Sequence, residues 1–192
     1  GITVMPGGTL LETAVRQGAE SAFFDAVCGF GFDGVEVSEG TIDLGRRKRT
    51  ALIREGRARG LKVFTEYGKK EAGSAIDPDA LRAAAEADWE AGAALVTIEA
   101  RESGTVGLFG GDGRPDRALF KRILRLIPHA DRLMWEAPLK EQQVFLIREA
   151  GPNVHLGNIA PGDVLTLEAM RRALRNDTFM LQREPAACDY AI

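Results

Sequence analysis

Four glutamates recur at or near the ends of short apolar runs. Glu36, Glu66, Glu99 and Glu136 are separated by 30, 33 and 37 residues, and Asn158 holds the same place in the next run. If these runs are successive parallel strands of a barrel, their carboxyl ends converge on one mouth, where the four carboxylates would meet. Carboxylate oxygens are hard ligands, so this mouth predicts a site for a divalent cation, with magnesium favoured. The alternative is a structural ion network in which some of these glutamates pair with Lys62, Arg101 or Lys140.

An arginine and a small polar motif follow the third of these runs. Arg101 comes two residues after Glu99, and Ser103 and Gly104 come next. The paired donors of a guanidinium suit phosphate, carboxylate or sulfite, and Ser103 and Gly104 could add hydroxyl and backbone donors. The residues alone leave an equal alternative, in which Arg101 bridges Glu99 and Glu136.

Other candidate groups are ambiguous when taken alone. Lys69 and Lys70 follow Glu66, and without further information they indicate two exposed lysines on a loop. The Gly7-Gly8 pair follows the first apolar run and permits close backbone approach, which serves an anion or a simple tight turn. His129 and His155 have no second His or Cys at ligand spacing, which argues against a zinc site.

The apolar runs alternate with helical patterns. We expect strands at residues 2–5, 34–38, 62–66, 94–99, 132–136 and 154–158. We expect helices at residues 10–30, 45–59, 79–91, 117–126, 141–149 and 161–175. Alternation of this kind predicts an α/β fold with parallel strands and crossover helices in a single domain, residues 1–192. The glutamates at successive strand ends favour a closed TIM-type barrel over an open doubly wound sheet, and no GxGxxG motif supports a dinucleotide site.

Composition excludes several classes of protein. The chain has 192 residues, 45% of them hydrophobic and 28% charged, with a net charge of −3. The sequence shows no basic face of the kind that indicates nucleic-acid binding. No apolar run in it approaches the roughly 18 residues of a membrane span. Cys28 and Cys188 form no disulfide framework, so we expect a reduced, cytoplasmic protein. The first residue is Gly and residue 2 already belongs to an expected strand, so we expect the sequence to begin inside the fold.

Six short motifs follow one another along the chain. They are Pro6-Gly7-Gly8-Thr9-Leu10, Val35-Glu36-Val37-Ser38-Glu39-Gly40, Thr65-Glu66-Tyr67-Gly68-Lys69-Lys70, Ile98-Glu99-Ala100-Arg101-Glu102-Ser103-Gly104, Trp135-Glu136-Ala137-Pro138 and Leu156-Gly157-Asn158-Ile159. In their order and spacing these motifs resemble those of the phosphosulfolactate synthase family. A closing stretch at residues 167–179 is also similar, so the resemblance runs from residue 1 to about 179.

The resemblance implies a TIM barrel and a magnesium-dependent addition of sulfite to phosphoenolpyruvate, the first step of coenzyme M biosynthesis. Negative charge would move onto the substrate carboxylate, giving an aci-carboxylate that a cation held by Glu66, Glu99 and Glu136 would stabilise. A general acid must then protonate the carbon that bears the phosphate. We expect Lys70 in that role, with Lys69 as the alternative, because a partly desolvated lysine near a cation has a lowered pKa.

The resemblance also implies the substrate contacts and the partners. Arg101, Ser103, Asn158 and the Gly7-Gly8 turn are the expected substrate-binding groups, and the partners are small molecules, with a homo-oligomer expected. Three residues depart from the family pattern, namely Tyr67, Ala100 and His155. Each adjoins an expected site residue, so the substrate or the activity could differ from those of the family.

The resemblance further implies two more β/α units ahead of this chain. Six units of an eight-unit barrel would leave two strand edges open, so we expect residues 1–192 alone to be unstable, prone to associate through these edges, and inactive. Two other functions stay open: a non-enzymatic, stress-associated barrel of the same family, and a different phosphate-binding TIM barrel.

Overall fold

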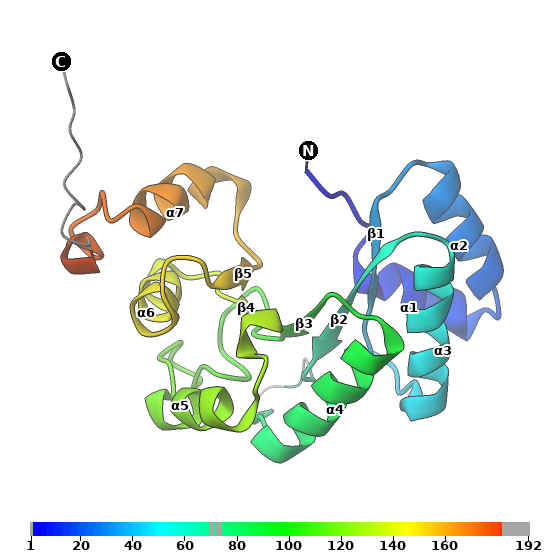
Figure 1. Cartoon of the computed structure of the whole chain (residues 1–192), viewed down its shortest axis with the longest axis horizontal. Helices are drawn as coiled ribbons and strands as arrows, with labels where there is room; N and C mark the ends of the chain where they lie inside the picture. Colours follow the sequence, from blue (N-terminus) through cyan, green and yellow to red (C-terminus); the bar gives the residue numbers. More distant parts are fainter. Residues whose placement is uncertain (1, 70, 72–73, 182–192) are drawn as a thin grey trace.

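A five-stranded parallel sheet forms the centre of the molecule (Figure 1). The structure, a computed structural model, describes residues 2–69, 71 and 74–181. The strands follow one another in chain order as neighbours in the sheet. They are β1 (Gly34–Val37), β2 (Lys62–Tyr67), β3 (Leu95–Ile98), β4 (Leu133–Glu136) and β5 (His155–Gly157).

Helices separate the strands and lie outside them. In Figure 1 the helices from α3 to α6 follow one another in an arc around the strands. The α-helices of the described residues are α1 (Gly8–Arg16), α2 (Glu20–Gly29), α3 (Gly45–Ala58), α4 (Pro78–Ala91), α5 (Arg117–Leu126), α6 (Lys140–Ala150) and α7 (Val164–Arg171). The described residues also contain three short 3-10 helices, at Ala130–Arg132, Pro161–Asp163 and Phe179–Leu181.

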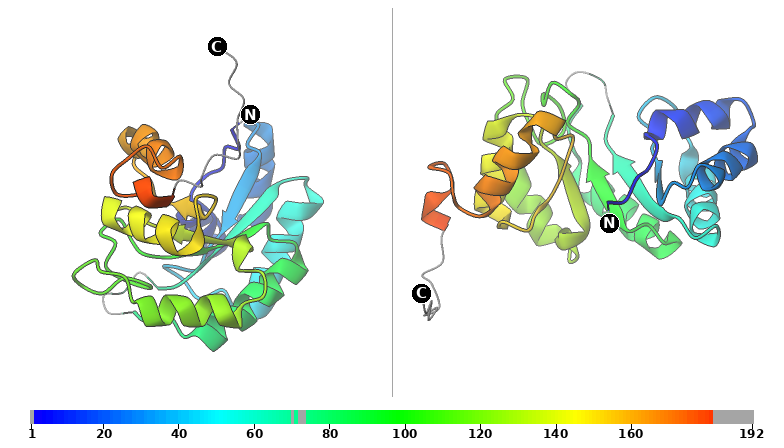
Figure 2. Two further views of the ribbon diagram at one scale, coloured as in Figure 1. Left: turned by 60° about the vertical axis from the view of Figure 1, so that its left-hand side comes forward. Right: turned by 90° about the horizontal axis from the view of Figure 1, so that it is seen from above.

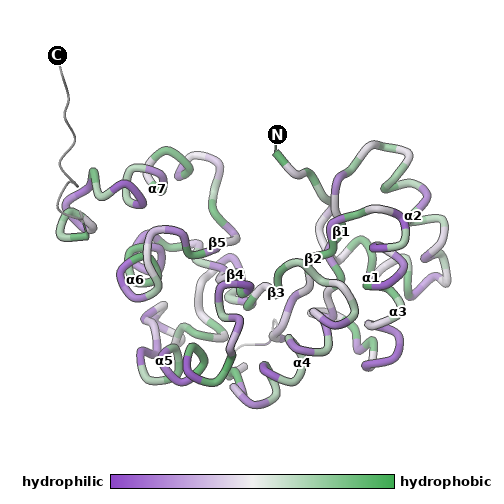
Figure 3. The backbone as a smooth tube through the Cα atoms, in the orientation of Figure 1, coloured by the Kyte–Doolittle hydropathy of each residue, from purple (hydrophilic) through white to green (hydrophobic). Residues whose placement is uncertain are grey.

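The strand order explains why helices gather on one side of the sheet. Parallel strands joined by right-handed crossovers place each connecting helix on the same face when the order never reverses. The views in Figure 2 show the same progression from α1 to α7 along the sheet. Hydrophobic and hydrophilic residues alternate along α3 to α6 in Figure 3, as expected of helices with one buried face.

The two faces of the sheet differ in chemistry. Val35, Val63 and Val96 are fully buried, and together with Trp135 they belong to the hydrophobic clusters shared with the helices. The ring of Trp135 lies 5.0 Å from that of Phe120 in α5, so the prediction that it packs against the helix layer is confirmed. Because side chains alternate along a strand, the intervening residues point to the opposite face, and these include the site glutamates.

The ends of α4 show how local sequence sets the elements. The side chain of Asp77 accepts hydrogen bonds from the backbone N–H groups of Asp79 and Ala80, at 3.0 and 3.4 Å, and Pro78 occupies the first turn. The helix ends at Gly92, whose φ of 113° is left-handed and favours glycine. Both ends lie where the sequence predicts them.

Three predicted elements differ in the structure. Residues 2–5 form no strand; instead the Val4 carbonyl accepts bonds from the N–H groups of Asp33 and Gly34, at 2.9 and 3.2 Å. The predicted helix 10–30 is two helices, because Gly18 at φ 65° ends the first. The predicted helix 161–175 is a 3-10 turn followed by α7, which ends at Arg171. Among the described residues, no helix is both long and apolar enough to span a bilayer.

Candidate active site

Three glutamates from neighbouring strands form one acidic cluster. Carboxylate oxygens of Glu66, Glu99 and Glu136 all lie within 4.8 Å of one another. Glu66 and Glu99 are buried, and Glu136 is half-buried. Three negative charges this close repel one another strongly away from bulk water, and a divalent cation would offset that repulsion. The donor set, three hard oxygen ligands, suits magnesium, calcium or manganese.

The register of the sheet brings these three residues together. Glu66 in β2 pairs with Thr97 in β3, and Glu99 lies two residues farther on, so both carboxylates point to the same face. Ile98 pairs with Trp135, which places Glu136 directly beside Glu99. All three residues therefore stand at the carboxyl ends of adjacent strands, as the sequence spacing predicts.

Two consecutive backbone amides hold the carboxylates in place. The N–H of Ala100 donates to Oε2 of Glu136 at 2.8 Å, and the N–H of Arg101 donates to Oε1 of Glu99 at 2.6 Å. Arg101 adopts a left-handed conformation, with φ of 62°. Such conformations cost about 1–3 kcal/mol and occur mainly where the surrounding structure enforces them.

A cavity of about 490 Å³ opens beside this cluster. Its lining joins acidic, basic and amide groups: Glu99, Arg101, Glu102, Ser103, Glu136 and Asn158. Asn158 follows β5 in a left-handed conformation, with φ of 56°. The structure thus places three of the predicted substrate-binding residues next to two of the predicted metal ligands, an arrangement that could bind a metal ion and an anion side by side.

The fourth strand-end glutamate has a different partner. Oε1 of Glu36 accepts a hydrogen bond from the N–H of Gly8, the first residue of α1, at 3.0 Å. A Cβ added at Gly8 would lie 2.5 Å from Oε1 of Glu36 and 2.7 Å from Cβ of Ser38, so any larger residue here would displace one of these side chains. The role of Gly7 and Gly8 in substrate binding stays a prediction, and Glu36 here caps a helix.

Of the two predicted acid candidates, the structure describes one. Lys69 is exposed, and its Nζ donates to the carbonyl of Glu39 at 2.8 Å, which ties the segment after β2 to the segment after β1. Lys70 lies outside the described residues.

A buried ion pair that the sequence analysis missed supports β2 from the helix side. Arg49 in α3 and Asp88 in α4 are 3% and 0% exposed. Nη2 of Arg49 lies 2.6 Å from Oδ2 of Asp88 and donates to the carbonyl of Glu66 at 2.9 Å. Arg49 stands within the basic run at residues 46–49, which by itself indicates a solvated helix face. Arg46 of the same run also reaches Asp88, at 3.1 Å, but its side chain is half-exposed. Burial and the bond to the Glu66 carbonyl distinguish Arg49 from Arg46.

Two glutamines of α6 hold the loops that frame the cavity, and the sequence analysis missed them as well. Gln142 is fully buried, and its Nε2 donates to the carbonyls of Gly104 and Gly113, at 2.8 and 3.0 Å. Nε2 of Gln143 donates to the carbonyl of Ala137 at 3.0 Å. Their sequence carries a faint signal, since two amide side chains at the start of an otherwise apolar helix face need buried partners.

The three departures from the family pattern occupy different environments. Tyr67 packs with the helix-side cluster, and burial together with the charge of Asp77 raises the pKa of its hydroxyl. Ala100 is buried and contributes only its backbone amide to the site. His155 is exposed and opens β5, at the opposite end of the strand from Asn158.

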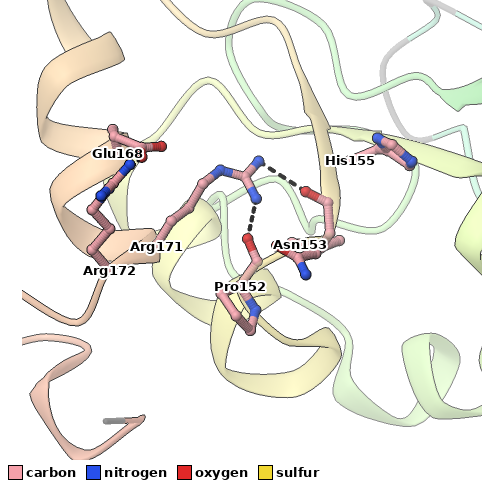
Figure 4. A pocket seen from close by; sticks show the side chains of 7 residues that line it. Pro152, Asn153, His155, Glu168, Arg171 and Arg172 are labelled. Carbon is pink, nitrogen blue, oxygen red and sulfur yellow. Dashed lines mark hydrogen bonds and ion pairs between the residues drawn. The ribbon is translucent and has the colours of Figure 1, made fainter. Parts of the chain in front are cut away.

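A second hollow, of about 430 Å³, lies near His155 at the amino end of β5 (Figure 4). Arg171 donates to the carbonyls of Pro152 and Val154, the latter at 2.8 Å, and Arg172 pairs with Glu168 at 2.6 Å. Desolvation lowers the pKa of Arg171, and both terminal nitrogens of its guanidinium donate to backbone carbonyls. This hollow is therefore a joint between α7 and β5, away from the acidic cluster.

Comparison with known proteins gives one consistent family. The family model for (2R)-phospho-3-sulfolactate synthase (ComA) matches residues 1–177. The phosphosulfolactate synthase of Methanothermobacter thermautotrophicus is 39% identical over 176 residues, which are 90% of this chain and 68% of that protein. Those of Methanocaldococcus jannaschii and Bacillus subtilis are each 37% identical, over 93% and 94% of this chain and 72% of their own length.

Proposed function

This chain belongs to the phosphosulfolactate synthase family, and we propose that it catalyses the magnesium-dependent addition of sulfite to phosphoenolpyruvate, giving 2-phospho-3-sulfolactate. The observation that carries the proposal is the adjacency of the acidic cluster to Arg101 within one cavity. A substrate with a carboxylate and a phosphate needs both a cation and an arginine. The cavity offers carboxylate ligands for the cation, and Arg101 is the arginine.

We propose that the strands belong to a TIM-type barrel. The unbroken order from β1 to β5 supports this, since a doubly wound sheet reverses its order at a switch point. The site at the carboxyl ends of the strands agrees with the usual layout of such barrels.

Glu66, Glu99 and Glu136 are the proposed metal ligands. When bound, the ion would supply positive charge to the substrate carboxylate as negative charge develops there. The amides of Ala100 and Arg101 donate to Glu136 and Glu99, so two of the three proposed ligands are oriented before the ion arrives. Burial of Glu66 and Glu99 limits competition from water.

Arg101, Ser103 and Asn158 are the proposed substrate contacts. The guanidinium of Arg101 can donate two parallel hydrogen bonds to a phosphate or sulfite oxygen pair, which fixes orientation as well as position. Ser103 already shares a hydrogen bond with the hydroxyl of Thr105 at 2.7 Å, and its hydroxyl can turn toward an anion. The Gly7-Gly8 turn stays a further candidate for anion binding.

The sulfur lone pair of sulfite would form the new bond to the terminal carbon of phosphoenolpyruvate. The π electrons of the substrate then move toward the neighbouring carbon, which carries the phosphate and takes up a proton. Lys70 is the proposed donor and Lys69 the alternative, since both follow the strand end that presents Glu66. Solvent or hydrogensulfite returns the proton to the lysine, so no electron donor or acceptor is needed.

The test follows phosphorus directly. The full-length protein is incubated with phosphoenolpyruvate, sulfite and magnesium, and ³¹P nuclear magnetic resonance follows conversion to a phosphate ester of different shift. We expect conversion that requires sulfite and stops when a chelator removes the cation. Conversion that proceeds undiminished in excess chelator, or no conversion by a folded preparation, would contradict the proposal.

A further inference from the structure

Gln142 connects three separate segments near the active site. Its side chain is fully buried in the first turn of α6. Nε2 donates to the carbonyls of Gly104 and Gly113, and Oε1 accepts the N–H of Leu139 at 3.1 Å. Only an amide side chain offers two donors and an acceptor from one planar group, so neither Glu nor an apolar residue can make the same set of bonds.

The Gly104 carbonyl belongs to the turn that carries the site amides. The N–H of Gly104 donates to the carbonyl of Arg101, and the N–H of Thr105 donates to the carbonyl of Ala100, both at 3.1 Å. The amides of Ala100 and Arg101 donate in turn to Glu136 and Glu99. A continuous chain of hydrogen bonds therefore runs from Gln142 through one tight turn to two carboxylates of the acidic cluster.

The turn has little intrinsic preference for its observed shape. Arg101 and Gly104 both have positive φ, 62° and 64°, and Arg101 has a Cβ that disfavours this region. A Cβ placed on Gly104 would lie 2.5 Å from Nε2 of Gln142, so the turn packs directly against the amide. Tertiary contacts must therefore hold the turn, and Gln142 supplies a buried donor to it.

We propose that Gln142 is a positioning residue for the active site, which sets the Arg101 guanidinium and the Glu99 carboxylate through the Ala100–Thr105 turn. This inference rests on the proposed function only for the identity of the substrate. Outer-shell partners of metal ligands typically contribute about 10–100-fold to metal affinity or activity. Loss of the Gln142 donors should act in that range on metal binding and on anion binding.

Two substitutions separate the possible roles of Gln142. Gln142→Met keeps the length of the side chain and removes all three hydrogen bonds. Gln142→Glu keeps an acceptor for the N–H of Leu139 but turns a second oxygen toward the Gly104 and Gly113 carbonyls. If the bonds to the turn position the site, both variants bind metal and substrate more weakly. If only the bond to Leu139 at the start of α6 is needed, the glutamate variant binds like wild type.

A control variant removes a comparable buried bond elsewhere. Thr178 is 1% exposed, and its hydroxyl donates to the carbonyl of Met170 at 2.8 Å, in the segment after α7. Thr178→Val keeps the shape and loses that bond. If the role of Gln142 is purely structural, substitutions at Gln142 and at Thr178 should change metal and substrate binding to a similar extent.

The measurements use the full-length protein at a temperature at which circular dichroism shows every variant folded. Manganese binding is followed by electron paramagnetic resonance, and phosphoenolpyruvate binding by calorimetry without sulfite. We expect Gln142→Met and Gln142→Glu to weaken both by about tenfold or more, with a KM increase that exceeds the fall in kcat, and Thr178→Val to stay within about twofold of wild type.

Unchanged manganese and phosphoenolpyruvate binding in both Gln142 variants would overturn the inference, as would equal losses in Thr178→Val. Wild-type protein that binds manganese but forms no product with sulfite would contradict the proposed function alone, because the binding comparison needs no turnover.

Discussion

Removal of Arg49 should destabilise the fold, because the buried carboxylate of Asp88 loses its buried partner. In Arg49→Met, Asp88 loses the guanidinium whose Nε lies 3.0 Å from both of its oxygens and whose Nη2 lies 2.6 Å away. The Glu66 carbonyl loses a donor at the same time. Asp88 keeps Arg46 at 3.1 Å, but that side chain is 49% exposed and weakly held.

The size of the effect follows from the burial of both partners. Breaking a buried ion pair by deleting one partner typically costs about 3–5 kcal/mol, whereas replacing both by apolar residues is often neutral. Because Arg46 remains, we expect Arg49→Met to lower the free energy of unfolding by about 3 kcal/mol. The double variant Arg49→Met/Asp88→Leu should recover more than half of that loss.

Urea unfolding, monitored by circular dichroism, measures these differences in the free energy of unfolding. An unchanged m-value checks that the unfolding transitions of the variants are comparable. The matched control is Arg122→Met, which breaks the Arg122–Asp79 pair between α5 and α4, where both side chains are 59% exposed. An exposed pair contributes at most about 1 kcal/mol. A loss under 1 kcal/mol in Arg49→Met, or a double variant less stable than the single, would refute the reasoning.

Three further predictions concern the catalytic groups and one acid-sensitive contact. In the full-length protein, Lys70→Ala should slow turnover by about 10²–10⁴-fold while phosphoenolpyruvate binding changes little, and near-normal steady-state turnover would instead assign the acid to Lys69 or an upstream lysine. Glu99→Gln should weaken manganese binding, measured by electron paramagnetic resonance, at least tenfold because it removes one of three anionic ligands; equal affinity would remove Glu99 from the ligand set. Burial raises the pKa of Glu12, but its hydrogen bonds from Ser38, Thr41 and Gly40 outweigh this and hold the pKa below its usual 4.5. A lowered pKa stabilises the fold above about 4.5 and loses that effect as the pH falls, so the stability difference between wild type and Glu12→Gln should shrink on acidification; a constant difference from pH 7 to pH 3 in thermal unfolding would contradict this.

The acidic cluster was predictable because it depends on one repeating feature. A glutamate at the end of each strand, combined with parallel pairing in chain order, is enough to bring Glu66, Glu99 and Glu136 together. Glu36 follows the same pattern, but the register pairs it with Phe64, two residues before Glu66, and the N–H of Gly8 binds its carboxylate. Sequence spacing cannot reveal that diversion, because it depends on where α1 begins.

The elements that were mispredicted failed for local reasons. The pattern at residues 2–5 is β-branched and apolar, as in a strand, yet strand formation needs a neighbour along its length, and in the described residues Val4 bonds only to the start of β1. The apolar periodicity of residues 10–30 continues across Gly18, whose left-handed backbone separates two helices. Periodicity indicates which face is buried, and it does not indicate whether the axis continues.

The supporting residues could not be found from sequence because their partners are distant. Gln142 bonds to carbonyls 38 and 29 residues away, and Arg49 bonds to a carboxylate 39 residues away. Backbone carbonyls carry no sequence signal at all. The residues that hold a site in place are therefore less visible in a sequence than the residues that act there.

Crystals grown or soaked with manganese and phosphoenolpyruvate test the central claim most directly. Anomalous scattering locates the ion without reference to any assumed ligand. We predict a single strong peak coordinated by Glu66, Glu99 and Glu136, with the substrate bound beside it and an anionic group of the substrate in contact with the guanidinium of Arg101. A peak at other residues, or substrate bound away from this cavity, would contradict the account.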